Sequence, residues 1–335
     1  MSKEYWQIAA GWEGRDYADR FIRHGMAFVG GDEKVATMQE VAVGDIVLLK
    51  RGMSKVVAAG EVVQRNGEHR GKDDKEWLRD FDGWDLRAYC YIDWRVPAKP
   101  LQTDGLTRTT IQRAPQDKHR KLADSLLSLP VQPFDPEPEK TNVIKDEQLL
   151  EFMIVLGLRP SAADELTNTI RKIRLLANYY YNECEWDDVR EHETRTFLVV
   201  PLLLALGWAE QQLKIELPCS GGRIDVACFL RPFQRKNEDC VLLIETKDFG
   251  SGLDYAPDQA RAYAADFPNC QALAVTNGYC YKTFLRVQDT NSFSEKPSAY
   301  LNLLKPRDRY PLDPQHTEGA LGVIKWLLPS SLQRG

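Results

Sequence analysis

The stretch Arg223-Ile224-Asp225, followed by Glu245-Thr246-Lys247 twenty positions after the aspartate, decides the fold expected for the C-terminal part of the chain. Glu245 ends the apolar run 241–244, which is typical of a buried strand. Because side chains alternate faces along a strand, Glu245 and Lys247 should point to one face and Thr246 to the other. A charged pair at the end of an apolar strand gives up hydrophobic burial, which indicates a functional role.

These residue types suit the hydrolysis of phosphodiester bonds. Asp225 and Glu245 can hold Mg²⁺ through carboxylate oxygens, with help from the backbone carbonyl of Thr246. Lys247 can orient or deprotonate the attacking water and stabilise the charge that develops on the phosphate. The sequence therefore predicts a Mg²⁺ site at Asp225, Glu245 and Thr246, with Lys247 as a catalytic neighbour.

The order of motifs around this site closely resembles the PD-(D/E)XK nuclease superfamily. In particular, it is similar to the N-terminal nuclease domain of type I restriction-enzyme motor subunits and its stand-alone relatives, over about residues 187–290. The matching pieces are Glu193-Thr194-Arg195, Val200-Pro201-Leu202-Leu203, Leu206-Gly207-Trp208, Asp225 with Glu245-Thr246-Lys247, Asp258 to Tyr263, and the strand 272–275.

The resemblance implies further site residues. Glu193 would lie beside the metal site, and Gln259 with Tyr263 would form a Gln-x-x-x-Tyr element next to the scissile strand. Gln259 and Tyr263 are four residues apart, so they share one helix face. The alternatives are a surface acid at Glu193, paired with Arg190 or Arg195, and an ordinary exposed glutamine with a half-buried tyrosine.

Composition limits the class of protein. The 335 residues allow two or three domains, and 43% hydrophobic content is ordinary for a globular protein. Seven scattered cysteines and five isolated histidines lack zinc-ligand spacing, which favours reduced thiols and a cytoplasmic location. No apolar run is long enough for a membrane span, and we expect no signal peptide. A net charge of −5 means that DNA binding must rely on local patches. No P-loop motif is present, so we expect no nucleotide cofactor.

The expected fold class is α+β multidomain, in four parts. Residues 1–112 form a small β-barrel with helices, and 113–143 form a Pro-rich linker with four prolines between 130 and 140. Residues 144–186 are helical, because Leu149, Leu150, Met153 and Ile154 share one helix face and a second helix fits 162–182. Residues 187–330 form the α/β nuclease domain.

The N-terminal part consists of short strands separated by glycine turns. Strands are expected near residues 5–10, 26–31, 43–50, 56–63 and 89–96. A short helix with Tyr17, Phe21 and Ile22 on its inner face should end at Gly25, in the C′ position. Many short strands with such turns favour a closed or half-closed barrel.

This pattern resembles the EVE branch of the PUA-like superfamily over about residues 4–100. The matching pieces are the opening strand into Gly11-x-x-Gly14-Arg15, Gly44-Asp45-Ile46-Val47, Gly60-Glu61-Val62 and Asp93-Trp94. Relatives of this branch read modified bases in DNA or RNA, which requires an aromatic pocket for a flipped base.

Several residues are candidates for that reading site. The aromatic candidates are Trp12, Tyr17, Phe28, Trp84 and Trp94. Asp32 and Asp85 could accept a hydrogen bond from a cytosine amine, and Arg15 and Lys50 could contact phosphates. Core aromatic residues, turn acids and solvated surface cations are the ordinary alternatives. The charged stretch 64–80 is either a solvated loop or a phosphate-contacting flap.

Together the two resemblances imply a modification-dependent (type II/IV-like) restriction endonuclease. It would recognise 5-methylcytosine or 5-hydroxymethylcytosine in double-stranded foreign or phage DNA by base flipping. A double-strand cut needs two active sites, so we expect a homodimer. Residues 144–183 are its candidate interface, although their apolar residues Leu175, Leu176, Tyr179, Tyr180 and Tyr181 could instead pack on the nuclease domain. An RNA-directed nuclease and a binding-only reader remain the alternatives.

Overall fold

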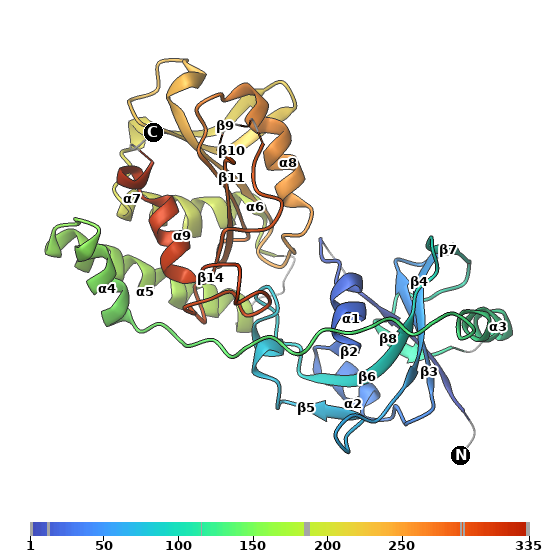
Figure 1. Cartoon of the computed structure of the whole chain (residues 1–335). Helices are drawn as coiled ribbons and strands as arrows, with labels where there is room; N and C mark the ends of the chain where they lie inside the picture. The colour runs from blue at the N-terminus through green and yellow to red at the C-terminus, as the bar shows by residue number, and fades with distance from the viewer. Residues whose placement is uncertain are drawn as a thin grey trace. The chain divides into compact units, whose positions relative to one another are not determined.

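The computed structural model describes residues 3–11, 14–114, 116–183, 188–288, 290 and 292–332. The chain divides into two compact units, residues 1–138 and 139–335, and each unit contains its own sheet (Figure 1). The fold is therefore mixed α+β. Among the described helices, none combines the length and the apolarity needed to cross a bilayer.

The first unit is built on a curled eight-stranded sheet (Figure 1). Its main path runs β2-β6-β4-β3-β1-β8, with β5 paired to β6 and β7 paired to β4. The β1–β3 pair is parallel, whereas the other pairs are antiparallel. The strands are β1 (Tyr5–Ala9), β2 (Met26–Val29), β3 (Ile46–Arg51), β4 (Lys55–Val62), β5 (Arg70–Lys72), β6 (Ala88–Arg95), β7 (Leu101–Gln102) and β8 (Ile111–Arg113).

Short helices connect these strands. The helices of this unit are α1 (Ala18–His24), α2 (Asp32–Met38), the 3-10 turn η1 (Glu76–Asp80) and α3 (Asp117–Leu126). Helix α1 ends at Gly25, whose φ of 59° is left-handed, as the sequence predicts. Helix α2 was not expected from the sequence.

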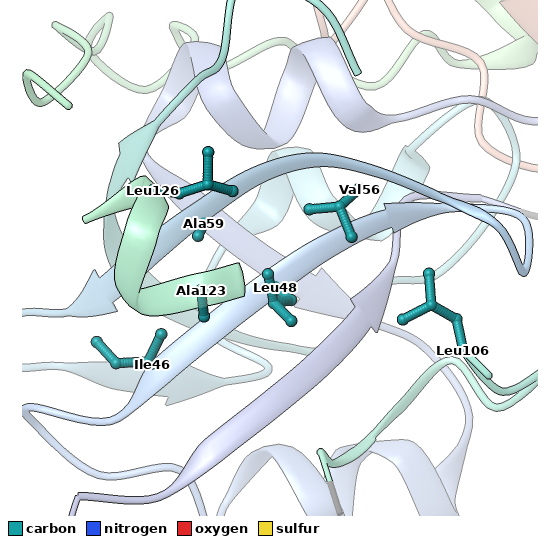
Figure 2. Packing of buried hydrophobic residues seen from close by; sticks show 7 residues of the cluster. All are labelled: Ile46, Leu48, Val56, Ala59, Leu106, Ala123 and Leu126. Atoms are coloured by element: carbon teal, nitrogen blue, oxygen red, sulfur yellow. The ribbon is translucent and has the colours of Figure 1, made fainter. Parts of the chain in front are cut away.

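Most of the segment expected to be a linker, residues 113–138, belongs to the first unit, and residues 139–143 belong to the second. Residues 117–126 form α3, whose Ala123 and Leu126 pack on apolar side chains of β3 and β4 (Figure 2). Further along, the backbone N–H of Gln132 donates to the Trp94 carbonyl at 2.8 Å, and that of Asp135 donates to the Arg23 carbonyl at 2.7 Å. The prolines prevent a regular strand, but these hydrogen bonds fasten the segment to β6 and to α1.

The charged stretch 64–80 is also tied into the first unit. Arg65 donates to the Ile92 carbonyl and to Asp93, and Arg70 donates to the Val41 carbonyl. Lys75 pairs with Glu137 at 2.6 Å. These three cations therefore serve internal contacts, which supports the structural alternative for them.

The second unit contains a six-stranded mixed sheet in the order β14-β13-β12-β11-β10-β9. Only the β11–β12 pair is parallel among its described strands, and α8 makes the crossover between them. The strands are β9 (Leu213–Cys219), β10 (Gly222–Phe229), β11 (Cys240–Thr246), β12 (Ala272–Thr276), β13 (Cys280–Leu285) and β14 (Ala299–Asn302). The acid-bearing motifs thus fall on adjacent strands, β10 and β11.

Helices surround this sheet. They are α4 (Asp146–Val155), α5 (Pro160–Glu183), α6 (Glu191–Thr194), α7 (Val200–Ala205), α8 (Ala256–Tyr263) and α9 (Ala320–Leu327), with 3-10 turns η3 (Glu210–Gln212), η4 (Asn237–Asp239), η5 (Ala264–Asp266) and η6 (Pro329–Ser331). The five-residue π segment η2 (Arg195–Val199) joins α6 to α7, so one helical stretch runs from Glu191 to Ala205. Such π turns are frequent at functional sites.

Candidate active site

Asp225 and Glu245 meet between two neighbouring strands. The Val226–Ile244 pair of the antiparallel β10–β11 ladder sets the two acids opposite each other. Asp225 is only 8% exposed and Glu245 only 3%. The backbone N–H of Thr246 donates to Asp225 Oδ2 at 2.6 Å. The two carboxylates among the predicted metal ligands therefore occupy one buried corner of the sheet.

Lys247 completes this corner. Its Nζ donates to Glu245 Oε1 at 2.5 Å and to Gln259 Oε1 at 3.1 Å. The structure thus places Glu245 and Lys247 on one face of the strand end, as the alternation of side chains predicts. The two acceptors leave Lys247 only partly exposed and fix its ammonium group beside the carboxylates.

Helix α8 holds Lys247 in place through a short chain of contacts. Gln259 Nε2 donates to the Tyr263 hydroxyl at 2.9 Å, one helical turn along. The buried Tyr263 side chain lies against Gly221, in the turn between β9 and β10, and against Gly222, the first residue of β10. A Cβ added at either glycine would stand 3.1 Å from the tyrosine. Tyr263 therefore orients Gln259, and Gln259 orients Lys247.

This chain of contacts leads to a prediction for Gln259, whose side chain is exposed. Gln259→Leu should lower a Lys247-dependent cleavage rate about tenfold, because the ammonium group loses one of its two acceptors. Tyr263→Phe should have a smaller effect, since the ring still packs against the glycine turn. Single-turnover rates would measure both, with the neighbouring exposed Asp258→Asn as the matched control. A Gln259→Leu protein that cuts as fast as that control would show that Gln259 does not position Lys247.

Arg195 also lies at this site, although the sequence predicts it only as a possible partner of Glu193. It is 7% exposed. Its Nη1 donates to Asp225 Oδ1 at 3.0 Å, and its Nη2 donates to Glu216 Oε1 at 2.7 Å. Arg195 thereby neutralises part of the charge of Asp225 and fixes the direction of that carboxylate.

Glu191, rather than Glu193, is the helix acid that faces the site. Glu191 Oε1 lies 3.8 Å from Arg195 Nη1, one turn away on the same helix. The carboxylate of Glu193 instead accepts the backbone N–H of Arg190 at 2.7 Å, which is a helix-capping contact. Two positions along a helix are about 200° apart around its axis, so the two acids point in different directions. Sequence order alone did not fix which of them turns inward.

Several acidic side chains lie close together at this site, and their proximity and burial shift their pKa values. Burial, reinforced by the neighbouring Asp225, raises the pKa of Glu245 to about 7. The same two causes raise the pKa of Glu191 to about 7. Lys247 opposes both shifts without cancelling them. The site therefore holds more negative charge than its own cations neutralise.

An oxygen-binding divalent ion fits this site. Glu245 Oε2 is buried and has no hydrogen-bond partner among the described residues. The Thr246 carbonyl points to the same side of β11 as its N–H, and therefore towards Asp225. Within the described ranges, there is no group of three or more Asp, Glu, His or Cys side chains that could hold a metal ion by themselves. Two carboxylates with a backbone carbonyl and water are a set that suits Mg²⁺.

The two helix acids give a paired prediction. Glu191→Gln should weaken Mg²⁺ binding about tenfold, because acids next to metal ligands typically contribute 10- to 100-fold in affinity. Glu193→Gln should leave Mg²⁺ binding unchanged, since glutamine can also accept the Arg190 N–H. Mg²⁺-dependent thermal stabilisation of each variant measures this without any cleavage assay. The reverse order of effects would restore Glu193 as the site residue.

The predicted reading-site aromatics of the first unit divide into two groups. Tyr17 and Phe28 are 6% and 2% exposed, and both pack against Phe81. Trp94 is also buried, at 1%. Trp84 is only partly buried, and the Arg15 guanidinium lies 3.9 Å from its ring centre. Trp12 lies outside the described residues.

The predicted polar residues of the reading site also have defined positions. Asp32 begins α2, is exposed, and pairs with Arg87 at 2.7 Å. Asp85 lies 3.7 Å from Arg79. The two predicted phosphate contacts are not surface cations, because Arg15 is 5% exposed and Lys50 is 1% exposed. Of the predicted reading-site residues that the structure describes, it brings together Arg15 with Trp84, and Tyr17 with Phe28 at 6.4 Å.

Comparison with known proteins adds no assignment. No protein-family model matches the chain. No curated protein matches it at a significant level.

Proposed function

We propose that this chain is a Mg²⁺-dependent, modification-dependent restriction endonuclease of the type IV kind. The observation that carries the proposal is the buried corner where Asp225, Glu245 and Lys247 meet, with Glu245 Oε2 unpartnered among the described residues. A buried acid pair of this kind costs stability unless it serves a ligand. The C-terminal unit would have the PD-(D/E)XK fold, and the N-terminal unit the EVE-like fold.

Each site residue has a role in the proposed reaction. Asp225, Glu245 and the Thr246 carbonyl would hold the ion, and Arg195 would keep the Asp225 carboxylate aligned. When bound, Mg²⁺ would polarise the scissile phosphate and lower the pKa of a coordinated water. Lys247, fixed by Glu245 and Gln259, would orient the attacking water and stabilise developing charge.

The first unit would supply the discrimination that this site lacks. Nothing in the Asp225–Glu245–Lys247 cluster reads a base, so unguided cutting would damage the host's own DNA. Trp84, stacked with Arg15, is the partly exposed aromatic residue available among the described candidates. We propose that it helps to hold a flipped 5-methylcytosine or 5-hydroxymethylcytosine of phage DNA.

A cleavage assay on matched substrates tests the proposed reaction. Purified protein would be given 5-hydroxymethylcytosine DNA or RNA of the same sequence, with Mg²⁺ or with EDTA. The proposal expects cutting of the DNA with Mg²⁺ only. Cutting of the RNA alone would favour the RNA-directed nuclease. Tight binding of the modified DNA without cutting of either substrate would favour the binding-only reader.

We also propose that the enzyme acts as a homodimer through α5. Tyr180 packs against Phe249, and Tyr181 packs against Tyr279, so these two tyrosines serve the second unit itself. Leu175 and Tyr179 are 72% and 55% exposed on the same helix. The two side chains are four residues apart and so lie next to each other on one helix face, and contiguous exposed apolar patches are typical of interaction surfaces.

Sedimentation velocity of the full chain tests this interface. The wild type should sediment as a dimer at micromolar concentration, and Leu175→Asp with Tyr179→Asp should sediment as a monomer. The double variant should then lose double-strand cutting while retaining single-strand nicking. The exposed Lys236→Asp, which lies in the second unit outside α5, serves as a charge control. A wild-type monomer at that concentration would contradict the proposal.

A further inference from the structure

A pocket of about 590 Å³ opens in the first unit at the ends of β1 and β3. Its lining contains the cations Lys34, Lys50 and Arg108, together with the hydroxyl-bearing Thr109 and Thr110. None of the described residues that line it is acidic. The pocket therefore presents positive charge and hydrogen-bond donors to any occupant.

Lys50 is the unusual member of this lining. It follows Ile46 and Leu48 on one face of β3, and both of those residues belong to the apolar cluster under α3. Its residue is 1% exposed, and its Nζ donates to the Thr107 carbonyl. Among the described residues, no carboxylate pairs with it. Burial lowers the pKa of Lys50 to about 8, so at neutral pH it is largely a buried cation without a counter-ion.

Nearby buried groups are also incompletely satisfied. Gln7 is fully buried, and its Oε1 accepts the backbone N–H of Thr107 at 3.2 Å. Its Nε2 has no hydrogen-bond partner among the described residues, and neither has Thr107 Oγ1. Buried polar groups are normally paired, so unpaired atoms beside a buried charge indicate a missing polar ligand.

We propose that this pocket binds a phosphate group, with Lys50 as its buried anchor and Arg108 as an exposed contact. Phosphate suits the lining because it carries charge and several acceptor oxygens, which a lysine, an arginine and threonine hydroxyls can meet together. The volume leaves room for more than the phosphate itself. The group can belong to a free nucleotide or to a nucleic-acid backbone, and the inference does not depend on the proposed nuclease activity.

Isothermal titration calorimetry on the full chain tests the proposal. The probes are inorganic phosphate, adenosine monophosphate and a short DNA duplex without terminal phosphates, at constant ionic strength in sodium chloride. The duplex is titrated into Asp225→Asn protein, so that cleavage cannot obscure binding. Lys50→Met removes the charge and keeps the length of the side chain, and Arg108→Gln changes an exposed position. Lys99→Gln, an exposed lysine outside the pocket lining, is the control.

The proposal expects at least one probe to bind the wild-type pocket. Lys50→Met should weaken that binding about tenfold or more, and Arg108→Gln several-fold, while Lys99→Gln has no effect. Lys50→Met should also melt no lower than wild type, because it removes an uncompensated buried charge. Binding of phosphate or of the monophosphate would identify a free ligand, and binding of the duplex alone would identify a backbone site.

Two results would overturn the proposal. One is that no probe binds more tightly than about 1 mM. The other is wild-type affinity in Lys50→Met protein. If Lys50→Met does not fold, Arg108→Gln decides, and wild-type affinity in that variant would contradict the phosphate site.

Discussion

Asp225→Asn should lower Mg²⁺-dependent DNA cleavage by at least about 10³-fold while the protein remains folded. The variant keeps the shape of the side chain and an oxygen that can accept the Thr246 N–H, but it removes the negative charge that a divalent ion requires. In the wild type Arg195 donates to Asp225 Oδ1 at 3.0 Å, so the new amide group of the variant would also face this arginine. Single-turnover cleavage rates measure the loss, and circular dichroism with thermal unfolding checks the fold.

Glu216→Gln is the matched control for this prediction. Glu216 contacts the same arginine, through Nη2 at 2.7 Å, but it is half exposed and is not among the predicted metal ligands. Its substitution should leave cleavage within about threefold of wild type, because an exposed ion pair contributes little. Equal losses in the two variants would mean that the arginine network, rather than metal binding by Asp225, explains the effect. Full activity in Asp225→Asn protein would remove Asp225 from the site.

Glu245→Gln should make the metal-free protein more stable. The same substitution should abolish Mg²⁺-dependent cleavage. Burial and Asp225 raise the pKa of Glu245 from 4.5 to about 7 in the folded chain. The folded state therefore binds the proton more tightly than the unfolded state, and the stability of metal-free wild type should fall as pH rises from about 4.5 to about 7. The shift corresponds to a loss on the order of 3 kcal/mol, and this figure already includes the opposing contact with Lys247.

Calorimetry at pH 5 and pH 8 without metal measures this effect. In Glu245→Gln protein the pH-dependent loss should be smaller, with only the contribution of Glu191 in the same direction, and Tm at pH 8 should exceed that of wild type by a few degrees. Added Mg²⁺ should raise the Tm of wild type and not that of Glu245→Gln. A lower Tm at pH 8 in the variant, together with unchanged Mg²⁺ stabilisation, would show that Glu245 is a structural residue.

The meeting of Asp225, Glu245 and Lys247 could be predicted from the sequence because it depends on local rules. Strand alternation places Glu245 and Lys247 on one face, and the acid-bearing motifs fall on neighbouring strands that pair directly. The i, i+4 spacing of Gln259 and Tyr263 likewise predicts their contact on α8. Each of these relations is set within a few residues or one strand pair.

The remaining details depend on packing that the sequence does not encode locally. Whether Glu191 or Glu193 turns inward depends on the rotation of the helical stretch that contains the π segment Arg195–Val199. In the first unit, Tyr17 and Phe28 lie in the core because of how the curled sheet and α1 meet. Lys50 resembles a surface cation in the sequence, yet the segment around Thr107 covers it. Helix α3 was not predicted, because it directly precedes a proline-rich stretch that indicated a linker.

The measurement that tests the central claim most directly is Mg²⁺-dependent cleavage of phage-type DNA in three forms. The forms are unmodified DNA, DNA with 5-methylcytosine and DNA with 5-hydroxymethylcytosine, each incubated with purified wild-type protein. The account predicts that at least one modified form is cut and that the unmodified form is not. Equal cutting of all three forms would contradict the proposed reading role of the first unit. No cutting of any form with Mg²⁺ would contradict the proposed restriction activity itself.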